Sequence, residues 1–195
     1  MSETFVINTL DGIVADKRED ELGPLTLYDD NHPMLQKKIP EYTGILPSRP
    51  MDRLSEQLKM TLKKFNGLGL SANQCGIFER MFVMVAQGEV ITCINPKLLE
   101  RSDELDKSRE GCLSYPGMYL SIPRHRWIIV EFNNTEGDIL QARLEGVEAR
   151  CFLHELDHMN GVRFVEHAGP VAIKLAKQKQ QKLLKKHNKL VKGMQ

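Results

Sequence analysis

The residues of this 195-residue chain that are best placed to do chemistry lie in the H-E-L-D-H segment at 154–158. On a helix, residues four apart lie about 40° apart around the axis, so His154 and His158 can face one cation. Glu155 then lies on a neighbouring stripe, from which it can reach a metal-bound water without becoming a ligand. The spacing therefore predicts a metal-dependent hydrolase with Glu155 as its general acid/base.

The competing interpretation is a pair of surface histidines beside a solvated Glu155 and Asp157. The apolar residues Leu144, Val147 and Cys151 share the stripe of the histidines. Because such a stripe normally faces the core, it favours a buried site over a solvated surface.

A catalytic metal site also needs a third protein ligand and an open position for water. Downstream of the helix, Glu166 and His167 are the candidates. Upstream, Cys112 follows a glycine in the E-G-C-L-S segment at 110–114. A lone cysteine is more often a small buried apolar residue than a ligand, so residue types and spacing leave all three candidates open.

The chain before these segments predicts an amphipathic helix that helps to frame the site. Prolines and a glycine punctuate residues 40–50, which are expected to be loop. Asp52 is the expected N-cap of the helix, and Asn66-Gly67 is its expected end. Its apolar face repeats at helical spacing through Leu54, Leu58, Leu62 and Phe65.

Strand-like runs follow at 81–86, 90–94 and 128–132, and residues 134–138 are typical of a hairpin turn. After the turn the period becomes helical, so the histidine segment is expected in a helix that ends near Gly161. Its apolar positions are Leu144, Val147, Cys151, Phe152 and Leu156. These elements predict an α+β fold, with mostly antiparallel sheets around a central metal-binding helix and a C-terminal basic helix.

Composition points to an intracellular enzyme rather than a secreted or membrane protein. No apolar run approaches the roughly 18 residues that span a bilayer. The N-terminus lacks the features of a signal or transit peptide, so a cytoplasmic location is expected. The four cysteines are widely spaced without a C-x-x-C pair, which disfavours a disulfide framework; they are Cys75, Cys93, Cys112 and Cys151.

The formal net charge of +1 hides a strong asymmetry. Residues 167–195 carry eight lysines and no acidic residue, whereas the rest of the chain has 19 basic and 26 acidic residues. We expect a catalytic domain over 1–168 and a lysine-rich helical extension over 169–195. The extension could be a solvated helix that docks lightly on the domain, or a helix that contacts the phosphates of RNA.

Three motifs occur in order about forty residues apart, and the combination closely resembles the peptide deformylases. They are G-L-G-L-S-A-N-Q at 67–74, E-G-C-L-S at 110–114 and H-E-L-D-H at 154–158. The I-N-P-K-L segment at 94–98 and the I-P-R-H-R-W segment at 122–127 also resemble the family. The resemblance covers roughly residues 25–166.

The resemblance implies roles for individual residues. It makes Cys112, with His154 and His158, the metal ligands, and Glu155 the catalytic carboxylate. The Gln74 amide and the Leu113 backbone N–H are then the donors to the developing oxyanion. The resemblance also implies that Glu110 and Arg124 form an ion pair near the metal-binding loop. The residues that it implies for substrate binding are Gly67, Leu68, Gly69, Tyr119, Val147, Arg150 and Cys151.

Two positions depart from the usual pattern of the family. Ser71 stands where alanine is common, and Leu153 replaces the glutamine that normally precedes the first histidine. Neither change removes a ligand. The two changes affect instead the packing around the site and the orientation of the groups next to the ligands.

The implied reaction is removal of the N-formyl group from the N-terminal methionine of newly made polypeptides, releasing formate. A metal-bound hydroxide would attack the formyl carbon. Ligand chemistry alone favours zinc, whereas the resemblance implies Fe²⁺, with Zn²⁺, Ni²⁺ or Co²⁺ as substitutes. The expected partners are N-formylmethionyl nascent peptides and, through the basic helix, the ribosome, with no membrane contact. The alternatives are an H-E-x-x-H metallopeptidase and a non-catalytic ribosome- or RNA-binding protein with a structural metal.

Overall fold

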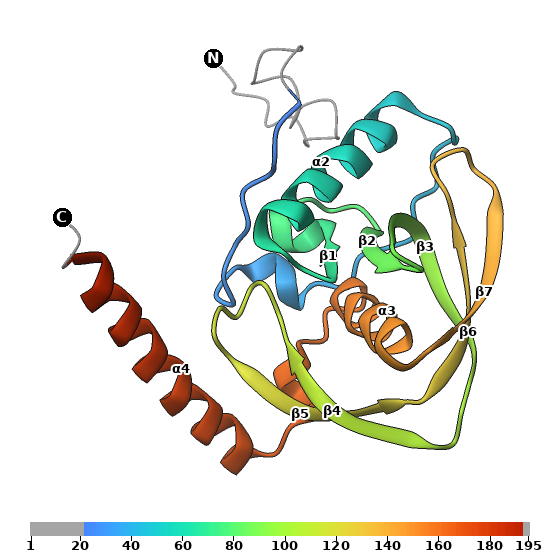
Figure 1. Ribbon diagram of the computed structural model, residues 1–195. Coiled ribbons are helices and arrows are strands. Elements are labelled where there is room, and N and C mark those ends of the chain that lie inside the picture. The colour runs from blue at the N-terminus through green and yellow to red at the C-terminus, as the bar shows by residue number, and fades with distance from the viewer. Residues whose placement is uncertain (1–21, 193–195) are drawn as a thin grey trace, which may run out of the picture.

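The computed structural model describes residues 22–192, with helix α3 (Gly146–Met159) held between two antiparallel sheets (Figure 1). The mixed α+β class with antiparallel sheets is therefore confirmed. The first 21 residues of the expected catalytic domain and the last three of the extension lie outside the described part. No helix within the described part is long and apolar enough to cross a membrane.

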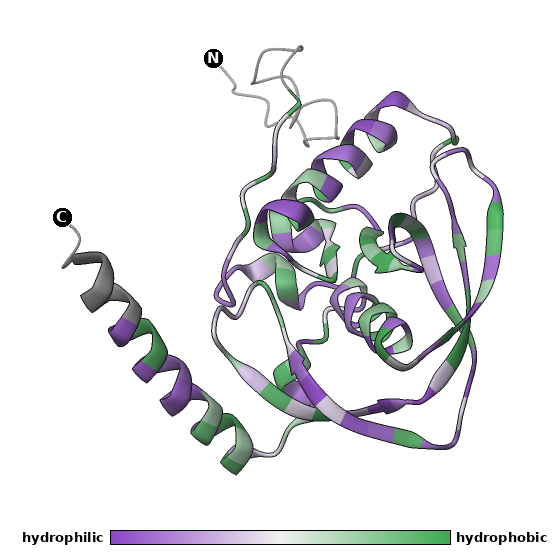
Figure 2. Ribbon diagram, viewed as in Figure 1, coloured by the Kyte–Doolittle hydropathy of each residue, from purple (hydrophilic) through white to green (hydrophobic). Residues whose placement is uncertain are grey.

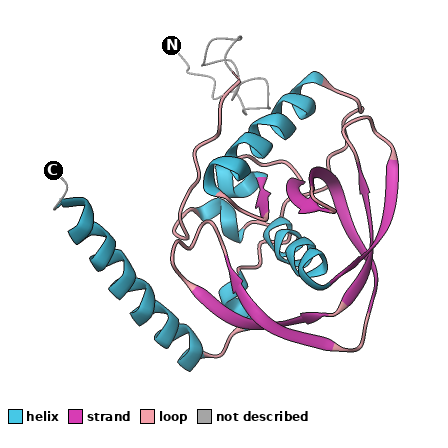
Figure 3. Cartoon of the chain, in the orientation of Figure 1, coloured by secondary structure: helices cyan, strands magenta, loops and turns pink. Residues whose placement is uncertain are grey.

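The larger sheet has five strands in the order β1-β2-β3-β6-β7, and every neighbouring pair is antiparallel. The smaller sheet pairs β4 with β5. Figure 3 shows the strands of both sheets around α3. The strands are β1 (Gly69–Ser71), β2 (Met81–Ala86), β3 (Glu89–Arg101), β4 (Leu105–Gly111), β5 (Tyr119–His125), β6 (Trp127–Asn133) and β7 (Ile139–Glu145).

The remaining elements are helical. Helix α2 packs against β1 and β2, and α4 leaves the body of the protein beyond β5 (Figure 1). Short 3₁₀ turns lie before α2, between β1 and β2, and between α3 and α4. The bounds are η1 (Pro33–Gln36), α2 (Arg49–Phe65), η2 (Ala72–Cys75), η3 (Phe164–His167) and α4 (Pro170–Lys192).

Helix α2 begins four residues earlier than expected, so the prediction of Asp52 as N-cap is wrong. Ser48 occupies the N-cap position, and Asp52 lies in the first turn. Proline fits the first turn of a helix because its missing N–H has no intrahelical partner there, so Pro50 does not delay the start. Asn66 ends the helix in the left-handed conformation, as expected.

The apolar face of α2 is confirmed for three of its four expected residues. Leu54, Leu58 and Leu62 are buried against β1 and β2, whereas Phe65 in the last turn is 41% exposed. Figure 2 shows the hydrophilic side of α2 turned away from the body of the protein. The core beneath α2 supports the edge of the larger sheet at β1, and β1 is part of the first motif.

Helix α3 is shorter at its start than the apolar pattern suggested. Leu144 belongs to β7, and Val147 is 63% exposed. Gly146, with a φ of 55°, turns the chain from the strand into the helix, so the helical period does not extend back to Leu144. The rest of the helix is buried as expected, with Phe152 packed edge-to-face on Phe82 of the larger sheet.

The expected run at 81–86 matches β2, and residues 134–138 form the turn between β6 and β7. The runs at 90–94 and 128–132 are correct but too short, since β3 continues to Arg101 and β6 is one residue longer at each end. Strand β4 is not predicted from the sequence, whereas β5 overlaps the I-P-R-H-R-W segment at 122–127, which resembles a strand of the family. The residues of β4 are almost all polar on both faces, so β4 lacks the apolar–polar alternation of a strand with one buried face.

Candidate metal centre and active site

Three potential metal-donor atoms converge at the centre of the fold. The donors of Cys112, His154 and His158 all lie within 4.8 Å of one another. The two histidines project from α3 at a spacing of one helical turn, with ring centroids 5.0 Å apart. Cys112 directly follows β4, and its Sγ is 3.3 Å from His158 Nε2.

The chemistry of these three donors fits a catalytic divalent metal. A thiolate and two imidazoles are ligands of zinc and other late first-row ions, and three protein ligands leave a position for water. Burial, together with the neighbouring His154, lowers the pKa of His158 well below its usual value, so its imidazole is neutral and can bind a metal. Burial also disfavours the imidazolium of His154, but hydrogen bonds to Cys112 and Glu110 raise its pKa overall. Metal binding displaces that proton.

Glu110 orients the first histidine of the motif. Its Oε1 lies 2.7 Å from His154 Nδ1, which leaves Nε2 as the free ring nitrogen for a metal. Arg124 donates to both carboxylate oxygens of Glu110, at 2.8 and 3.1 Å. Burial would raise the pKa of Glu110, but His154 and Arg124 hold it well below its usual value. The carboxylate is therefore ionised and holds the imidazole in one orientation.

Asp157, the remaining acid of the motif, faces away from the donor cluster. It pairs with Arg124 at 2.6 Å and with His167 Nε2 at 2.7 Å. Glu166, the other downstream candidate for a third ligand, pairs with Arg163. Neither Glu166 nor His167 belongs to the metal-donor group found among the described residues.

Glu155 lies beside the donors with only 2% of its surface exposed. Burial raises its pKa to about 7. Gly69 of β1 makes room for this carboxylate, because a Cβ on Gly69 would overlap Glu155 Oε1 and come within 2.8 Å of Cys151 Sγ. Ser71, two residues later, donates a hydrogen bond to Glu155 Oε2.

Gln74 reaches the donor cluster from the 3₁₀ turn η2. Its Oε1 accepts a hydrogen bond from the Ser71 backbone N–H at 2.9 Å, which fixes the amide group. Its Nε2 then points to Cys112 Sγ at 3.4 Å and to Ser114 Oγ at 3.1 Å. Ser114 belongs to the second motif but has no role predicted from the sequence. Its partner could not be identified there because Gln74 is 40 positions away.

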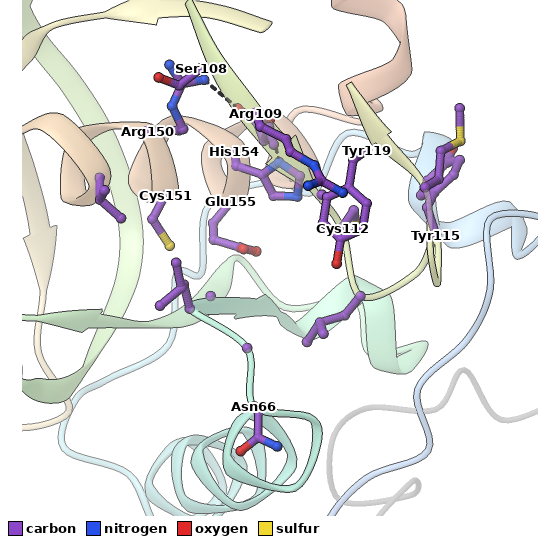
Figure 4. Close-up of a pocket in the computed structure, with 18 of the residues that line it drawn as sticks. Asn66, Ser108, Arg109, Cys112, Tyr115, Tyr119, Arg150, Cys151, His154 and Glu155 are labelled. Atoms are coloured by element: carbon purple, nitrogen blue, oxygen red, sulfur yellow. Dashed lines mark hydrogen bonds and ion pairs between the residues drawn. The ribbon is translucent and has the colours of Figure 1, made fainter. Parts of the chain in front are cut away.

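A cavity of about 550 Å³ opens onto the donors (Figure 4). It runs between β1 and the β4–β5 sheet, and His154, Glu155, Gln74, Cys112 and Leu113 all contribute to its wall. Every residue expected to bind substrate also lines it: Gly67, Leu68, Gly69, Tyr119, Val147, Arg150 and Cys151. The structure thus brings the expected substrate-binding residues and the metal donors to one cavity.

The guanidinium group of Arg150 is engaged with protein groups around the cavity. Its Nη1 donates to Glu110 and to the Ile122 carbonyl, and its Nη2 donates to Asp106. These bonds tie α3 to both strands of the smaller sheet. Leu153, the other departure from the family pattern, is 8% exposed and packs in the core between α3 and the larger sheet.

Sequence gaps of about forty residues separate the three motifs, yet the fold brings them together around a set of metal donors and a buried carboxylate. This arrangement defines a metal-dependent hydrolase. The family model of polypeptide deformylase matches residues 24–174. The chain therefore belongs to the peptide deformylase family.

Similar sequences and solved structures are also peptide deformylases. The peptide deformylase of Thermotoga maritima is 37% identical over 139 residues, which cover 68% of this chain and 85% of that protein. The crystal structure of a Synechococcus elongatus peptide deformylase in complex with actinonin has a TM-score of 0.76 at 29% identity, covering 81% of this chain and 88% of the other. The Met-Ala-Ser-bound enzyme from Acinetobacter baumannii has a TM-score of 0.72 at 26% identity, covering 74% and 98%.

Proposed function

We propose that this enzyme removes the formyl group from N-formylmethionine at the start of newly made polypeptides. The observation that carries the proposal is the cluster of Cys112, His154 and His158 beside the buried Glu155, at the wall of an open cavity. Binding of Met-Ala-Ser by the Acinetobacter baumannii enzyme supports it, because that tripeptide is the product expected from formyl-Met-Ala-Ser.

Each side chain at the wall has a proposed task. A metal held by Cys112, His154 and His158 would supply Lewis-acid activation of water and of the formyl carbonyl. Glu155 takes a proton from the attacking water and delivers it to the leaving amine nitrogen. The Gln74 amide and the Leu113 backbone N–H donate to the developing oxyanion, and one such donor is typically worth about 3 kcal/mol.

The cavity wall suggests how the peptide is held. Among the described strands, β1 pairs only with β2 and forms an edge of the larger sheet, so backbone groups at Gly67 and Leu68 can bind an extended peptide by strand addition. The methionine side chain would lie against Val147, Cys151 and the aliphatic part of Arg150. Tyr119 is 50% exposed and is one of the side chains that line the cavity in Figure 4. It would contact the peptide at the rim of the cavity.

The proposed metal is Fe²⁺, with Zn²⁺, Ni²⁺ or Co²⁺ as active substitutes. A thiolate with two imidazoles accommodates all four ions and by itself favours zinc, so the choice of iron rests on the resemblance to the family. Metal analysis of protein purified under anaerobic conditions should find close to one iron per chain. Zinc as the dominant ion under those conditions would contradict the iron proposal.

The reaction is tested by formate release from formyl-Met-Ala-Ser. Glu155→Gln should retain the metal and lose at least about 1,000-fold in kcat, since it removes the proton carrier but none of the ligands. Cys112→Ser should lose metal affinity as well. Cleavage of an internal peptide bond, with Cys112 dispensable, would instead indicate a metallopeptidase. Unchanged behaviour of Glu155→Gln in every assay would indicate a non-catalytic binding protein.

We further propose a cytoplasmic location, a catalytic domain over 1–168 and a ribosome-binding role for the extension over 169–195. Helix α4 carries lysines without an acidic residue, which favours contact with phosphate. Ala176 on α4 is nevertheless buried against the domain, and Gln180 donates to the Pro116 carbonyl at 2.9 Å. Deletion of the extension would remove these contacts as well as the charge.

Charge-only variants of α4 are therefore the sharper test of ribosome contact. Replacement of Lys179, Lys182 and Lys185 by Gln should weaken ribosome binding and reduce its salt dependence while sparing turnover of the formyl tripeptide. Replacement of Lys59, Lys63 and Lys64 on α2 changes charge equally and serves as the matched control. Equal loss of binding in both sets would assign the effect to net charge and contradict a role of α4.

A further inference from the structure

We propose that Ser71 is a positioning residue for Glu155. The hydroxyl of Ser71 holds one carboxylate oxygen of Glu155, so that the other carboxylate oxygen faces the cavity. The inference rests on the proposed role of Glu155 as proton carrier. It concerns a side chain that the family pattern does not supply, because alanine is common at this position and cannot donate a hydrogen bond.

Among the described residues, Glu155 is the one whose side chain accepts from the hydroxyl of Ser71. Ser71 ends β1 and is fully buried. Its Oγ donates to Glu155 Oε2 and also lies 3.5 Å from the Glu155 backbone carbonyl. Both acceptors belong to one residue of α3, so the hydroxyl connects the edge strand directly to the catalytic position of the helix. A hydroxyl has a single proton, and an ionised carboxylate can only accept it.

The other carboxylate oxygen occupies the space left by a missing side chain. A Cβ on Gly69 would overlap Glu155 Oε1, so this oxygen lies against the Gly69 backbone. Gly69 itself lines the cavity that contains the metal donors. With Oε2 held by Ser71, Oε1 is the oxygen directed toward the cavity and toward a water to be deprotonated.

The backbone holds Ser71 in place. Ser71 pairs with Phe82 of β2 in the larger sheet, and the Ser71 N–H donates to Gln74 Oε1 at 2.9 Å. Ser71 therefore contacts both proposed catalytic side chains, Gln74 through the backbone and Glu155 through the hydroxyl. Any residue can supply the backbone contact, but among common side chains of this size only a hydroxyl donates well to the carboxylate. The Ser71 side chain also accepts from the Gln74 backbone N–H in the capping box of η2, so Ser71→Thr, which can keep both contacts, is the necessary companion to Ser71→Ala.

The test is steady-state kinetics of Ser71→Ala on formyl-Met-Ala-Ser. A hydrogen bond to a charged group is among the stronger ones in proteins, so we expect kcat to fall about tenfold. KM should stay within about twofold and the metal content should be unchanged, because neither the peptide-binding wall nor the ligands are altered. Ser71→Thr retains the hydroxyl and should recover most of the lost kcat. A kcat for Ser71→Ala within about twofold of the unmodified enzyme would overturn the inference.

A matched control separates positioning from the general cost of removing a buried hydroxyl. Ser55 is 1% exposed, and its Oγ lies 2.6 Å from Thr92 Oγ1, outside the cavity wall. Ser55→Ala should lower the unfolding temperature while leaving kcat unchanged. If Ser55→Ala reduced kcat as much as Ser71→Ala does, the effect would be one of packing and the inference would be wrong.

A second readout does not depend on turnover. In the full-length chain freed of metal by a chelator, thermal unfolding is compared for Ser71→Ala with Glu155 present and with Glu155→Gln. At a pH well above the pKa of Glu155, loss of the hydroxyl leaves a charged acceptor unpaired in the first case and a neutral amide in the second, so the shift should be larger when Glu155 is present. Equal shifts would contradict the hydrogen bond. Absence of formate release by the unmodified enzyme would refute the proposed function itself, whereas this cycle tests the contact alone.

Discussion

At the scale of single residues, the active site depends on how closely Glu155 can approach strand β1. The absence of a side chain at Gly69 leaves the space that Glu155 Oε1 occupies. No positive φ is involved at this position, so the requirement for glycine is one of volume rather than backbone conformation. Glycine at this point of the first motif is thus explained by a contact with the third.

Gly69→Ala should therefore impair catalysis more than stability. The added methyl group would displace the carboxylate, and a misplacement of about 1 Å in a catalytic group can cost about 100-fold in rate. We expect a loss of that size in kcat with the metal retained. Gly23→Ala, at a glycine with no atom within 4 Å of an added Cβ, is the control and should be indistinguishable from the unmodified enzyme.

Glu110 is the second residue whose removal has a defined consequence. It pairs with Arg124 and Arg150 and holds His154, and the side chains of Glu110 and Arg124 are 5% and 6% exposed. Glu110→Gln leaves two buried guanidinium groups without this carboxylate. Breaking a buried ion pair on one side typically costs about 3 kcal/mol or more, which denaturant unfolding of the metal-free protein should detect.

The matched control for Glu110 is Glu104, which pairs with Arg126 at 3.1 Å on the surface. Both partners are more than half exposed, so Glu104→Gln should change the free energy of unfolding by less than about 1 kcal/mol. Equal effects at the two sites would mean that burial does not govern the strength of the Glu110 network.

At the scale of elements, the position of α3 is set at both ends. Arg150 ties its first turns to the smaller sheet. At the other end, the Ile39 N–H donates to the Met159 carbonyl at 2.9 Å, and Arg80 donates to the carbonyls of both residues. These contacts hold His154 and His158 opposite Cys112, which comes from a different element.

Gly161 is the point where the end of α3 turns against the N-terminal segment. It has a φ of 72°, and an added Cβ would lie 2.9 Å from the Gln36 carbonyl oxygen and from Lys38 N. Gly161→Ala combines backbone strain with a clash against backbone atoms, and we expect about 2 kcal/mol of destabilisation in denaturant unfolding. Gly169→Ala has no atom within 4 Å and no positive φ, so it should be neutral.

At the scale of the whole molecule, the metal donors connect parts of the fold that are distant in sequence. Cys112 lies in the loop that joins the two strands of the smaller sheet, while His154 and His158 belong to the helix between the sheets. A ligand that binds only the folded state stabilises it by mass action, by about 4 kcal/mol at 1,000 times its dissociation constant.

Removal of the metal by a chelator should therefore lower the unfolding temperature by about 10 °C for a chain of this size. Cys112→Ser provides the comparison, because a variant with weakened metal binding should respond little to the chelator. A chelator effect as large in Cys112→Ser as in the unmodified protein would show that the stabilising ion binds elsewhere.

Local sequence patterns were sufficient where the physics is local. The helical period placed the histidine motif in α3, and a turn signature placed the β6–β7 hairpin. Local reasoning failed at Asp52, because Pro50 allows an earlier helix start, and at Leu144, because Gly146 separates strand from helix. Strand β4 is polar on both faces and carries no alternation by which it could be found, whereas β5 overlaps the I-P-R-H-R-W segment that resembles a strand of the family.

The sequence by itself determined the three motifs, the identity of the reactive side chains and, through resemblance, the family. Residue types and spacing left the third donor open, and beyond what the resemblance implied, it is the tertiary structure that places Cys112 Sγ beside His158, 46 positions away, and not Glu166 or His167. It also decided that Ser71 meets Glu155 across 84 positions. Such contacts depend on how an edge strand packs against a helix, and no spacing within either segment encodes that packing.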